Sequence, residues 1–140
     1  MKRIPQICVV LLLSITLFSC SKTEYVLPKQ DGQWNIDKQI TATTMNDVTT
    51  YQTAYDIGIA TFTDDGKGSI SDNGVVLETF TWDVSGDVIT ITYDISTTTI
   101  AFTILDDSAS DYQHWSGSYS YMLGPTEVVI ETDLTMSAIK

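Results

Sequence analysis

The chain has 140 residues, a formal net charge of −11 and a single histidine. Its seven basic residues are Lys2, Arg3 and five scattered lysines, so no basic patch can form. Binding to nucleic acid requires basic side chains that displace counterions from phosphates, and this class of function is therefore excluded. Electrostatic attraction to anionic lipid headgroups is excluded for the same reason.

The first twenty residues have the anatomy of a secretory signal. Lys2 and Arg3 precede an almost unbroken apolar run at residues 7–13, and Leu17-Phe18-Ser19-Cys20 ends the segment. The run is too short for a membrane span and is typical of a cleaved signal peptide. Its ending resembles the lipobox of bacterial lipoproteins, in which the cysteine is lipidated and becomes the first mature residue. The resemblance implies a signal peptide at residues 1–19 and acyl chains such as palmitate on Cys20.

Lipid on Cys20 would anchor the mature protein to a membrane without spanning it, because each buried methylene contributes roughly 0.8 kcal/mol. We expect a location in the cell envelope, at the outer membrane. Residues 21–24 lack the dense acidic run that resembles surface-export signals, which favours the periplasmic side and leaves the surface face as the alternative. An ordinary secretory cut that leaves a free thiol on Cys20 is the competing interpretation.

The mature part divides into a tether and one domain. Residues 20–31 are polar, contain Pro28 and show no sustained period, so they are interpreted as a lipidated tether. Residues 32–140 suffice for a single domain with its own core. Cys8 is lost with the signal peptide, so no cysteine pair remains for a disulfide and the core alone must hold the fold. Loss of Lys2 and Arg3 lowers the formal charge by two, from −11 to −13.

Alternation of apolar and polar residues predicts strands, because successive side chains of a strand point to opposite faces. The alternation is clearest in four segments: 80–84, 88–93, 98–104 and 128–136. The residues that we expect to be buried on the apolar faces are Ile89, Ile91, Phe102, Ile104, Ile130 and Leu134.

Turn signals separate these strands at short intervals. Residues 84–88 predict a tight hairpin, residues 63–68 a glycine-containing turn, and Gly124-Pro125 a break before the last strand. A short helix around residues 44–50 is disfavoured by its threonines. We therefore predict an all-β fold of about eight strands, an antiparallel meander barrel that is closed or partly open, with no helix beyond a turn or two.

Three short motifs resemble those of lipocalin-like domains in small bacterial lipoproteins. They are Gly32-Gln33-Trp34, the Phe-x-x-Asp-Gly turn at residues 62–66, and the Trp-x-x-x-Gly-Asp hairpin at residues 82–87. The resemblance covers residues 32–136 and implies a meander barrel with an internal cavity for a small apolar molecule. Lipocalins commonly pair the first-strand tryptophan with an arginine, but no arginine follows Arg3 here, and Lys140 is the available substitute.

An aromatic set provides the candidate ligand site. Residues two apart share a face of a strand, so the row of Trp115, Gly117, Tyr119 and Tyr121 opposes Ser116, Ser118 and Ser120. Aromatic rings with polar tips suit a ligand pocket, although core packing is the competing explanation and is favoured for Trp82. The predicted ligand-binding residues are Trp82, Tyr93, Trp115, Tyr119 and Tyr121.

Catalysis and metal binding are weakly supported by the sequence. His114 is the single histidine, with no identifiable nucleophile, and is interpreted as a polar-face strand residue. Asp106, Asp107 and Asp111 lie in an oxygen-rich loop that could take calcium, but this loop and residues 64–66 both lack the spacing of an EF-hand. We predict no enzyme activity, no metal and no cofactor.

Two functions remain open. The first is a lipid-anchored, lipocalin-like protein that binds a small apolar or amphipathic molecule. The second is a structural or interaction lipoprotein with a filled barrel, which contacts protein or glycan. A cavity of several hundred Å³ would favour the first, and a solid interior with exposed aromatic residues would favour the second. The sequence indicates no oligomeric state.

Overall fold

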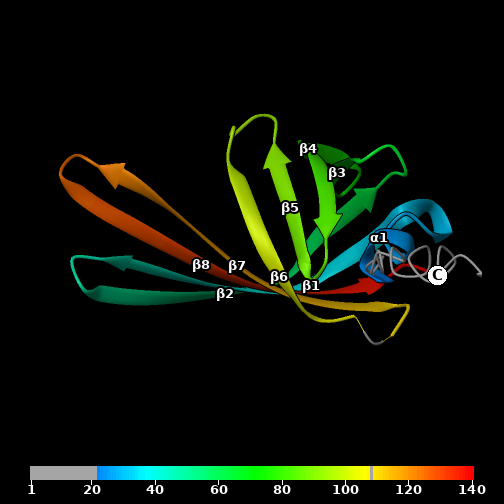
Figure 1. Ribbon diagram of the computed structural model, residues 1–140, viewed down its shortest axis with the longest axis horizontal. Helices are drawn as coiled ribbons and strands as arrows, with labels where there is room; N and C mark the ends of the chain where they lie inside the picture. Colours follow the sequence, from blue (N-terminus) through cyan, green and yellow to red (C-terminus); the bar gives the residue numbers. More distant parts are fainter. Residues whose placement is uncertain (1–21, 108) are drawn as a thin grey trace, which may run out of the picture.

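The fold is a closed antiparallel barrel of eight strands that follow one another around the barrel in chain order (Figure 1). The computed structural model describes residues 22–107 and 109–140. The first strand closes the barrel because it pairs with both the second strand and the last. The prediction of an all-β meander barrel is therefore confirmed. The strands are β1 (Gln33–Met45), β2 (Val48–Phe62), β3 (Lys67–Asp72), β4 (Val75–Ser85), β5 (Val88–Tyr93), β6 (Thr99–Asp106), β7 (Tyr112–Leu123) and β8 (Thr126–Ala138).

The connections are short and mostly as predicted. Gly86 lies in the β4–β5 turn, Gly66 in the β2–β3 turn, and Gly124-Pro125 between β7 and β8. Residues 44–50 form the β1–β2 hairpin rather than a helix, with Asn46 and Asp47 at positive φ in its turn. In a meander, alternate connections lie at opposite ends of the barrel. The hairpins β1–β2, β3–β4, β5–β6 and β7–β8 therefore share one end, which we call the open end.

Four long strands extend beyond the barrel wall. β2 pairs with β3 only from Ile59 to Phe62, and β7 pairs with β6 only from His114 to Ser118. Beyond these residues, β2, β1, β8 and β7 continue as a four-stranded sheet, which we call the extension (residues 41–53 and 118–133). In Figure 1 the extension runs to the left, away from β4, β5 and β6. The inner face of the barrel thus continues onto a wall that stands open on one side.

The core fills the half of the barrel opposite the open end. The ring of Phe62 is at its centre and packs edge-on against Phe80, Trp82 and Trp115, with centroid distances of 5.4, 5.6 and 6.0 Å. Edge-to-face packing is the favourable arrangement for such rings. These aromatic rings fill the centre of this half of the barrel.

The predicted core residues are buried to different depths. Ile89, Ile91 and Phe102 are buried, which confirms the prediction for these three. Ile104, Ile130 and Leu134 are only partly buried, which corrects it. Ile130 and Leu134 border a cavity, and Ile104 lies next to the irregular pairing between β6 and β7.

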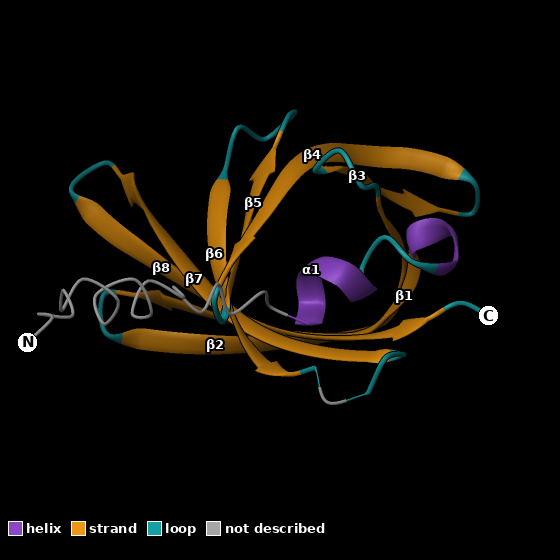
Figure 2. Ribbon diagram, turned by 45° about the vertical axis from the view of Figure 1, so that its right-hand side comes forward, coloured by secondary structure: helices purple, strands orange, loops and turns teal. Residues whose placement is uncertain are grey.

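Residues 22–31 are folded against the barrel, so the prediction of a tether is wrong for them. They form the short helix α1 (Lys22–Val26) and the 3₁₀ turn η1 (Gln30–Gly32), and Figure 2 shows α1 inside the ring of strands. Val26 and Leu27 are buried, and the Trp34 indole N–H donates to the Leu27 carbonyl at 2.9 Å. One helical turn buries too few residues to show a period, which is why the sequence pattern missed it. The folded domain includes residues 22–31, and we call this end of the barrel the plugged end.

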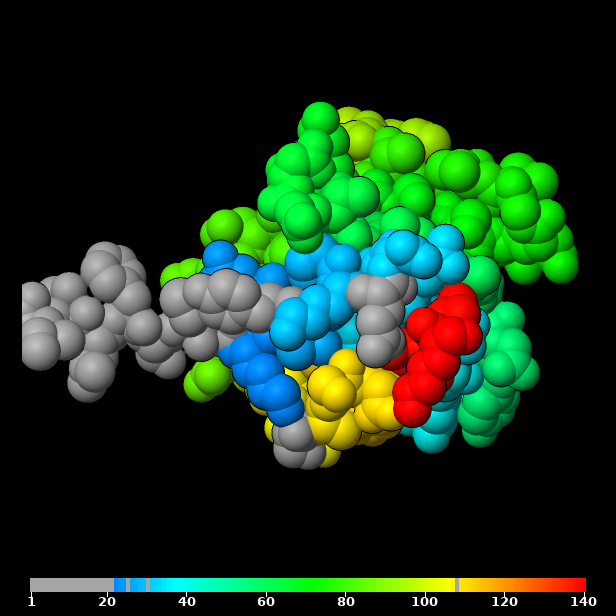
Figure 3. All heavy atoms as spheres, turned by 90° about the vertical axis from the view of Figure 1, so that its right-hand side faces the viewer, coloured from blue at the N-terminus to red at the C-terminus, as the bar shows by residue number. Residues whose placement is uncertain are grey.

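Polar contacts hold the plug as well. Thr23 is fully buried, and its Oγ1 lies 2.9 Å from Asp107 Oδ2 and 3.2 Å from Gln113 Oε1. Figure 3 looks onto the plugged end and shows the N-terminal segment, the residues before β7 and the C-terminal residues gathered on one face. Buried polar groups that find partners favour one docked arrangement over alternatives.

Truncating Leu27 tests whether the plug belongs to the fold. Leu27→Ala should lower the free energy of unfolding by about 2–5 kcal/mol, because a fully buried side chain is lost and a cavity is left. Lys29→Ala, at an exposed neighbouring position, is the matched control and should change stability by less than about 0.5 kcal/mol. Urea unfolding of the two variants measures the free energy of unfolding. If the two variants were equally stable, residues 22–31 would be a tether that does not contribute to the stability of the fold.

The Gly-x-Trp motif has a steric explanation here. Gly32 has φ +65°, and a Cβ at this position would lie 1.9 Å from the Phe62 carbonyl oxygen. Only glycine allows this approach, after which Trp34 turns into the barrel and meets the Leu27 carbonyl. Lys140 does not replace the missing arginine, since its ammonium forms an exposed ion pair with Asp111 at 3.0 Å.

Candidate ligand site at the open end

A cavity of about 200 Å³ lies where the barrel opens toward the extension. Aliphatic side chains and the Phe102 ring form most of its wall. Polar groups come from Tyr93, Tyr119 and Gln39, together with two threonines of β1 and β8. An apolar wall with a few convergent polar groups is the usual composition of a small-molecule site.

Gly117 creates the boundary between this cavity and the packed core. A Cβ on Gly117 would lie 2.7 Å from Phe102 Cδ1 and 2.9 Å from the Ala101 carbonyl oxygen. The missing side chain therefore lets the Phe102 ring lie across β7. On one side of this ring stands Trp115 in the core, and on the other stands Tyr119 in the cavity wall.

The structure divides the predicted ligand-binding residues into two groups. Tyr93 and Tyr119 both line the cavity, and Tyr121 lies farther out on the same face of the extension, 46% exposed. Trp115 is fully buried against Phe62 and Phe102, so the structure does not bring it to the cavity. The parity of the row is as expected, and Ser116 and Ser118 line a groove on the opposite, outer face.

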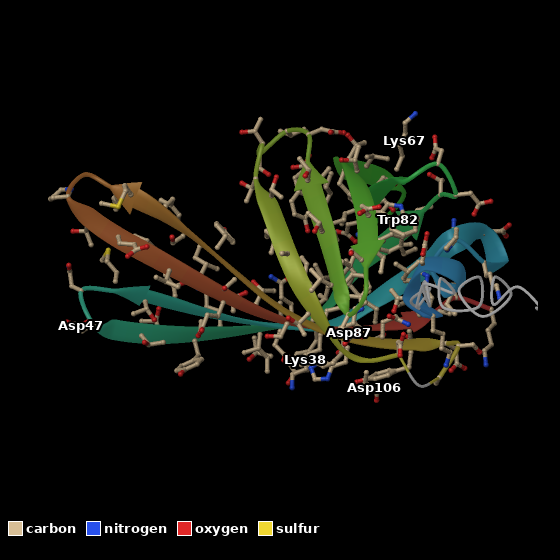
Figure 4. All side chains as sticks on the ribbon, viewed as in Figure 1. Lys38, Asp47, Lys67, Trp82, Asp87 and Asp106 are labelled. Atoms are coloured by element: carbon tan, nitrogen blue, oxygen red, sulfur yellow. The ribbon has the colours of Figure 1, made fainter. Side chains whose placement is uncertain are left out.

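Trp82 belongs to the plugged end. Its indole N–H donates to the Lys67 carbonyl at 3.0 Å, and Figure 4 labels both residues. Its ring packs edge-on against Phe62. It borders a separate, open depression between α1 and β4, together with Glu24 and Asp83. Trp82 is thus separated from Tyr93 and Tyr119 by the aromatic core.

The polar cavity residues on β1 were not predicted from the sequence. The pairing of β1 with both neighbours shifts between Ile36 and Lys38. This bulge changes which residues face inward, so that Gln39 and Thr41 follow Ile36 on the inner face. A bulge leaves no mark in an apolar–polar alternation, and no sequence signal could have identified these two residues.

Tyr93 is the cavity residue with the most perturbed ionisation. Burial, the carboxylate of Glu78 and the neighbouring Tyr119 raise the pKa of Tyr93 to about 12. The Tyr93 ring also packs against Phe80 at a centroid distance of 5.9 Å. At neutral pH the hydroxyl is therefore an un-ionised hydrogen-bond donor at the cavity wall.

An alkaline titration should reveal this tyrosine. Because its pKa in the folded protein lies above the ordinary tyrosine value of 10, Tyr93 contributes stability below pH 10 that is lost as the pH rises toward about 12. We expect the ultraviolet absorbance of tyrosinate to show a late step near pH 12 that disappears in Tyr93→Phe. Tyr55→Phe, at an exposed site, should keep that step. Ionisation of every tyrosine near pH 10 in the folded protein would contradict the prediction.

The other candidate groups lie outside this cavity. His114 Nε2 lies 3.0 Å from both carboxylate oxygens of Asp133, on the outer side of the barrel. Asp107 is engaged with Thr23, and the Lys140 ammonium, through its hydrogen bond, lowers the pKa of Asp111. Within residues 22–107 and 109–140, no group of three or more histidine, cysteine or acidic side chains is arranged to hold a metal.

No known protein family, curated protein or solved structure matches this chain. None of the helices in the described ranges is long and apolar enough to cross a membrane. The fold alone defines the class of protein, which is a closed eight-stranded antiparallel meander barrel. One end of this barrel is plugged by α1, and the other opens into a cavity.

Proposed function

We propose that the protein is a lipid-anchored, lipocalin-like lipoprotein of the cell envelope that binds a small apolar or amphipathic molecule at the open end of its barrel. The observation that carries this proposal is the cavity lined by Tyr93, Tyr119 and aliphatic side chains. Its aromatic rings offer flat contact area, and their hydroxyls offer hydrogen bonds at the edge of that area.

The size of the cavity limits what it can enclose. Small-molecule sites usually measure about 300–1,000 Å³, and this cavity measures about 200 Å³. It can therefore hold a single ring or a short acyl segment, and the rest of the molecule would lie on the inner face of the extension. Tyr121, Met45 and Leu123 are on that face and are between 42% and 60% exposed.

The anchor supports a defined orientation. Cys20 precedes the first residue of α1 by two positions, and two residues span at most about 7 Å. Because α1 is docked in the plugged end, lipid on Cys20 would hold that end close to the bilayer. The open end would then face away from the membrane and receive its ligand from the aqueous side.

A second candidate function is an interaction lipoprotein that contacts protein or glycan. Exposed apolar and aromatic residues on the outer face of the extension favour it, among them Tyr51 at 73% and Met122 at 62% exposure, and Tyr55 is 67% exposed on the adjoining part of β2. Patches of this kind often mark interaction surfaces. The aromatic core of the barrel also agrees with this candidate.

Titration with a neutral, environment-sensitive apolar dye such as Nile red distinguishes the two candidates. The protein is used without its signal peptide and with Cys20→Ser, so that no lipid competes. Tyr119→Ala should weaken dye binding by about tenfold, because the ring lines the cavity, whereas Tyr51→Ala should leave it unchanged. Dye binding that is lost in Tyr51→Ala and kept in Tyr119→Ala would move the site to the outer face and contradict the first proposal.

A further inference from the structure

We infer that the molecule bound at the open end carries a positive charge, so that its class is a cationic amphiphile with a small apolar group and an amine or quaternary ammonium head. This inference rests on the proposed function and specifies its ligand. It is drawn from the distribution of charge around the cavity.

Every hairpin of the open end carries a carboxylate and no lysine. The β1–β2 hairpin has Asp47, the β3–β4 hairpin has Asp72, the β5–β6 hairpin has Asp94 and the β7–β8 hairpin has Glu127. All four side chains are exposed. Asp94 follows the wall residue Tyr93, and Asp72 lies two positions from the wall residue Ile70, whereas Asp47 and Glu127 lie farther out on the extension. Their negative charge attracts cations and repels anions.

The lysines lie elsewhere. The described residues contain five of them, and four belong to the plugged end: Lys22, Lys29, Lys67 and Lys140. Figure 4 shows Lys67 on the α1 side and Asp47 at the far tip of the β1–β2 hairpin. The fifth, Lys38, lies beside the β1 bulge with its ammonium 5.9 Å from the centre of the Tyr55 ring. An acidic headgroup at the mouth would therefore meet no ammonium group of the described chain.

Glu78 places one carboxylate beside two residues of the cavity wall. It pairs directly with Ile70, a wall residue, and its charge acts on Tyr93. Its oxygens accept hydrogen bonds from the backbone N–H groups of Ile95 at 2.8 Å and Ser96 at 3.3 Å. A carboxylate offers about four lone-pair sites, so these two bonds leave capacity for a further donor.

Aromatic rings complete a site for a cation. Tyr93 and Tyr119 line the cavity and Tyr121 follows outside it on the same face. The face of such a ring attracts an ammonium group within about 6 Å. The apolar wall suits an apolar tail, and the carboxylate and the tyrosine faces suit a positive head group. The tail would therefore lie in the cavity and the head at its mouth.

Three ligands with the same decyl chain test the sign of the charge. Calorimetric titrations below micelle-forming concentrations compare decyltrimethylammonium, decanol and decanoate. The cation should bind about tenfold tighter than decanoate, with decanol between them. This preference should shrink as salt is raised, because exposed charges are screened beyond about 10 Å at 0.1 M ionic strength.

Paired variants locate the effect. Glu78→Gln keeps one acceptor oxygen, enough for the shorter bond from the Ile95 N–H, and loses the acceptor for the longer bond from the Ser96 N–H. It should reduce the preference for the cation several-fold while leaving decanol affinity unchanged. Asp83→Asn, an exposed carboxylate near α1, is the matched control and should have no effect. If Glu78→Gln unfolds the β5–β6 loop, the double variant Asp72→Asn/Asp94→Asn tests the same preference through the two carboxylates that adjoin the wall residues Ile70 and Tyr93.

The outcomes separate this inference from the proposed function. Decanoate binding as tightly as decyltrimethylammonium, or a cation preference unchanged by both carboxylate variants, would overturn the inference and leave the binding function intact. Absence of binding for all three ligands would overturn the proposed function and the inference with it.

Discussion

Trp115→Ala is expected to lower the free energy of unfolding by about 3–5 kcal/mol, the largest single-residue effect on stability that we anticipate. Trp115 is fully buried and packs against the rings of Phe62 and Phe102. Its removal leaves a large cavity in the aromatic core of the barrel. It also removes the indole N–H that donates to Gln113 Oε1 at 3.0 Å.

Gln113 increases this cost. It is fully buried, and its Nε2 group already has no hydrogen-bond partner among the described residues. Loss of Trp115 would also remove the hydrogen bond that the Oε1 atom of Gln113 accepts from the indole. Buried polar groups without hydrogen-bond partners cost about 1–3 kcal/mol of stability. The Trp115 variant is therefore predicted to be impaired in folding rather than specifically in ligand binding.

Tyr121→Ala is the matched control, since Tyr121 stands on the same face of β7 but is 46% exposed. It should change stability by less than about 1 kcal/mol. Urea unfolding of both variants provides the comparison. If the Trp115→Ala protein were as stable as the Tyr121→Ala protein and had only a lower ligand affinity, Trp115 would be a ligand-binding residue rather than a core residue.

Cys20→Ser should move the protein from the membrane fraction to the soluble fraction. This prediction follows from the proposed lipidation, because the acyl chains on Cys20 would be the sole apolar anchor after processing. Two or more chains give effectively stable attachment, so their loss should produce an all-or-none change in fractionation. Membrane and soluble fractions from cells expressing each form are compared by immunoblot.

Cys8→Ser is the control for this experiment. Cys8 lies within the predicted signal peptide, so its replacement should leave the mature protein attached to the membrane. Persistent membrane association of the Cys20→Ser protein, or release of the Cys8→Ser protein, would contradict the lipobox interpretation.

Much of the barrel could be predicted from local sequence patterns. The alternation around Ile89, Ile91 and Phe102 identified inward-facing residues, because side-chain direction in a strand follows the pleat. The turns at Gly86 and Gly124-Pro125 fell where glycine and proline interrupt that alternation. These features depend on neighbours in the chain, and the sequence contains them directly.

Position along the barrel axis could not be predicted in this way. Trp115, Tyr119 and Tyr121 share one face, yet they lie in the core, at the cavity and on the open extension, respectively. The difference depends on where β6 stops pairing with β7 and on the Phe102 ring that fills the space at Gly117. Both are relations between distant segments, which alternation within one strand does not encode.

Native mass spectrometry of the domain purified from its own host tests most directly whether the open-end cavity holds a small molecule. We expect the wild-type protein to retain one small organic molecule. Ile130→Trp, which fills the cavity from a partly buried wall position, should fold and lose that molecule. A wild-type protein that shows only its bare mass, or a retained molecule that is unaffected by Ile130→Trp, would show that the cavity is not the binding site.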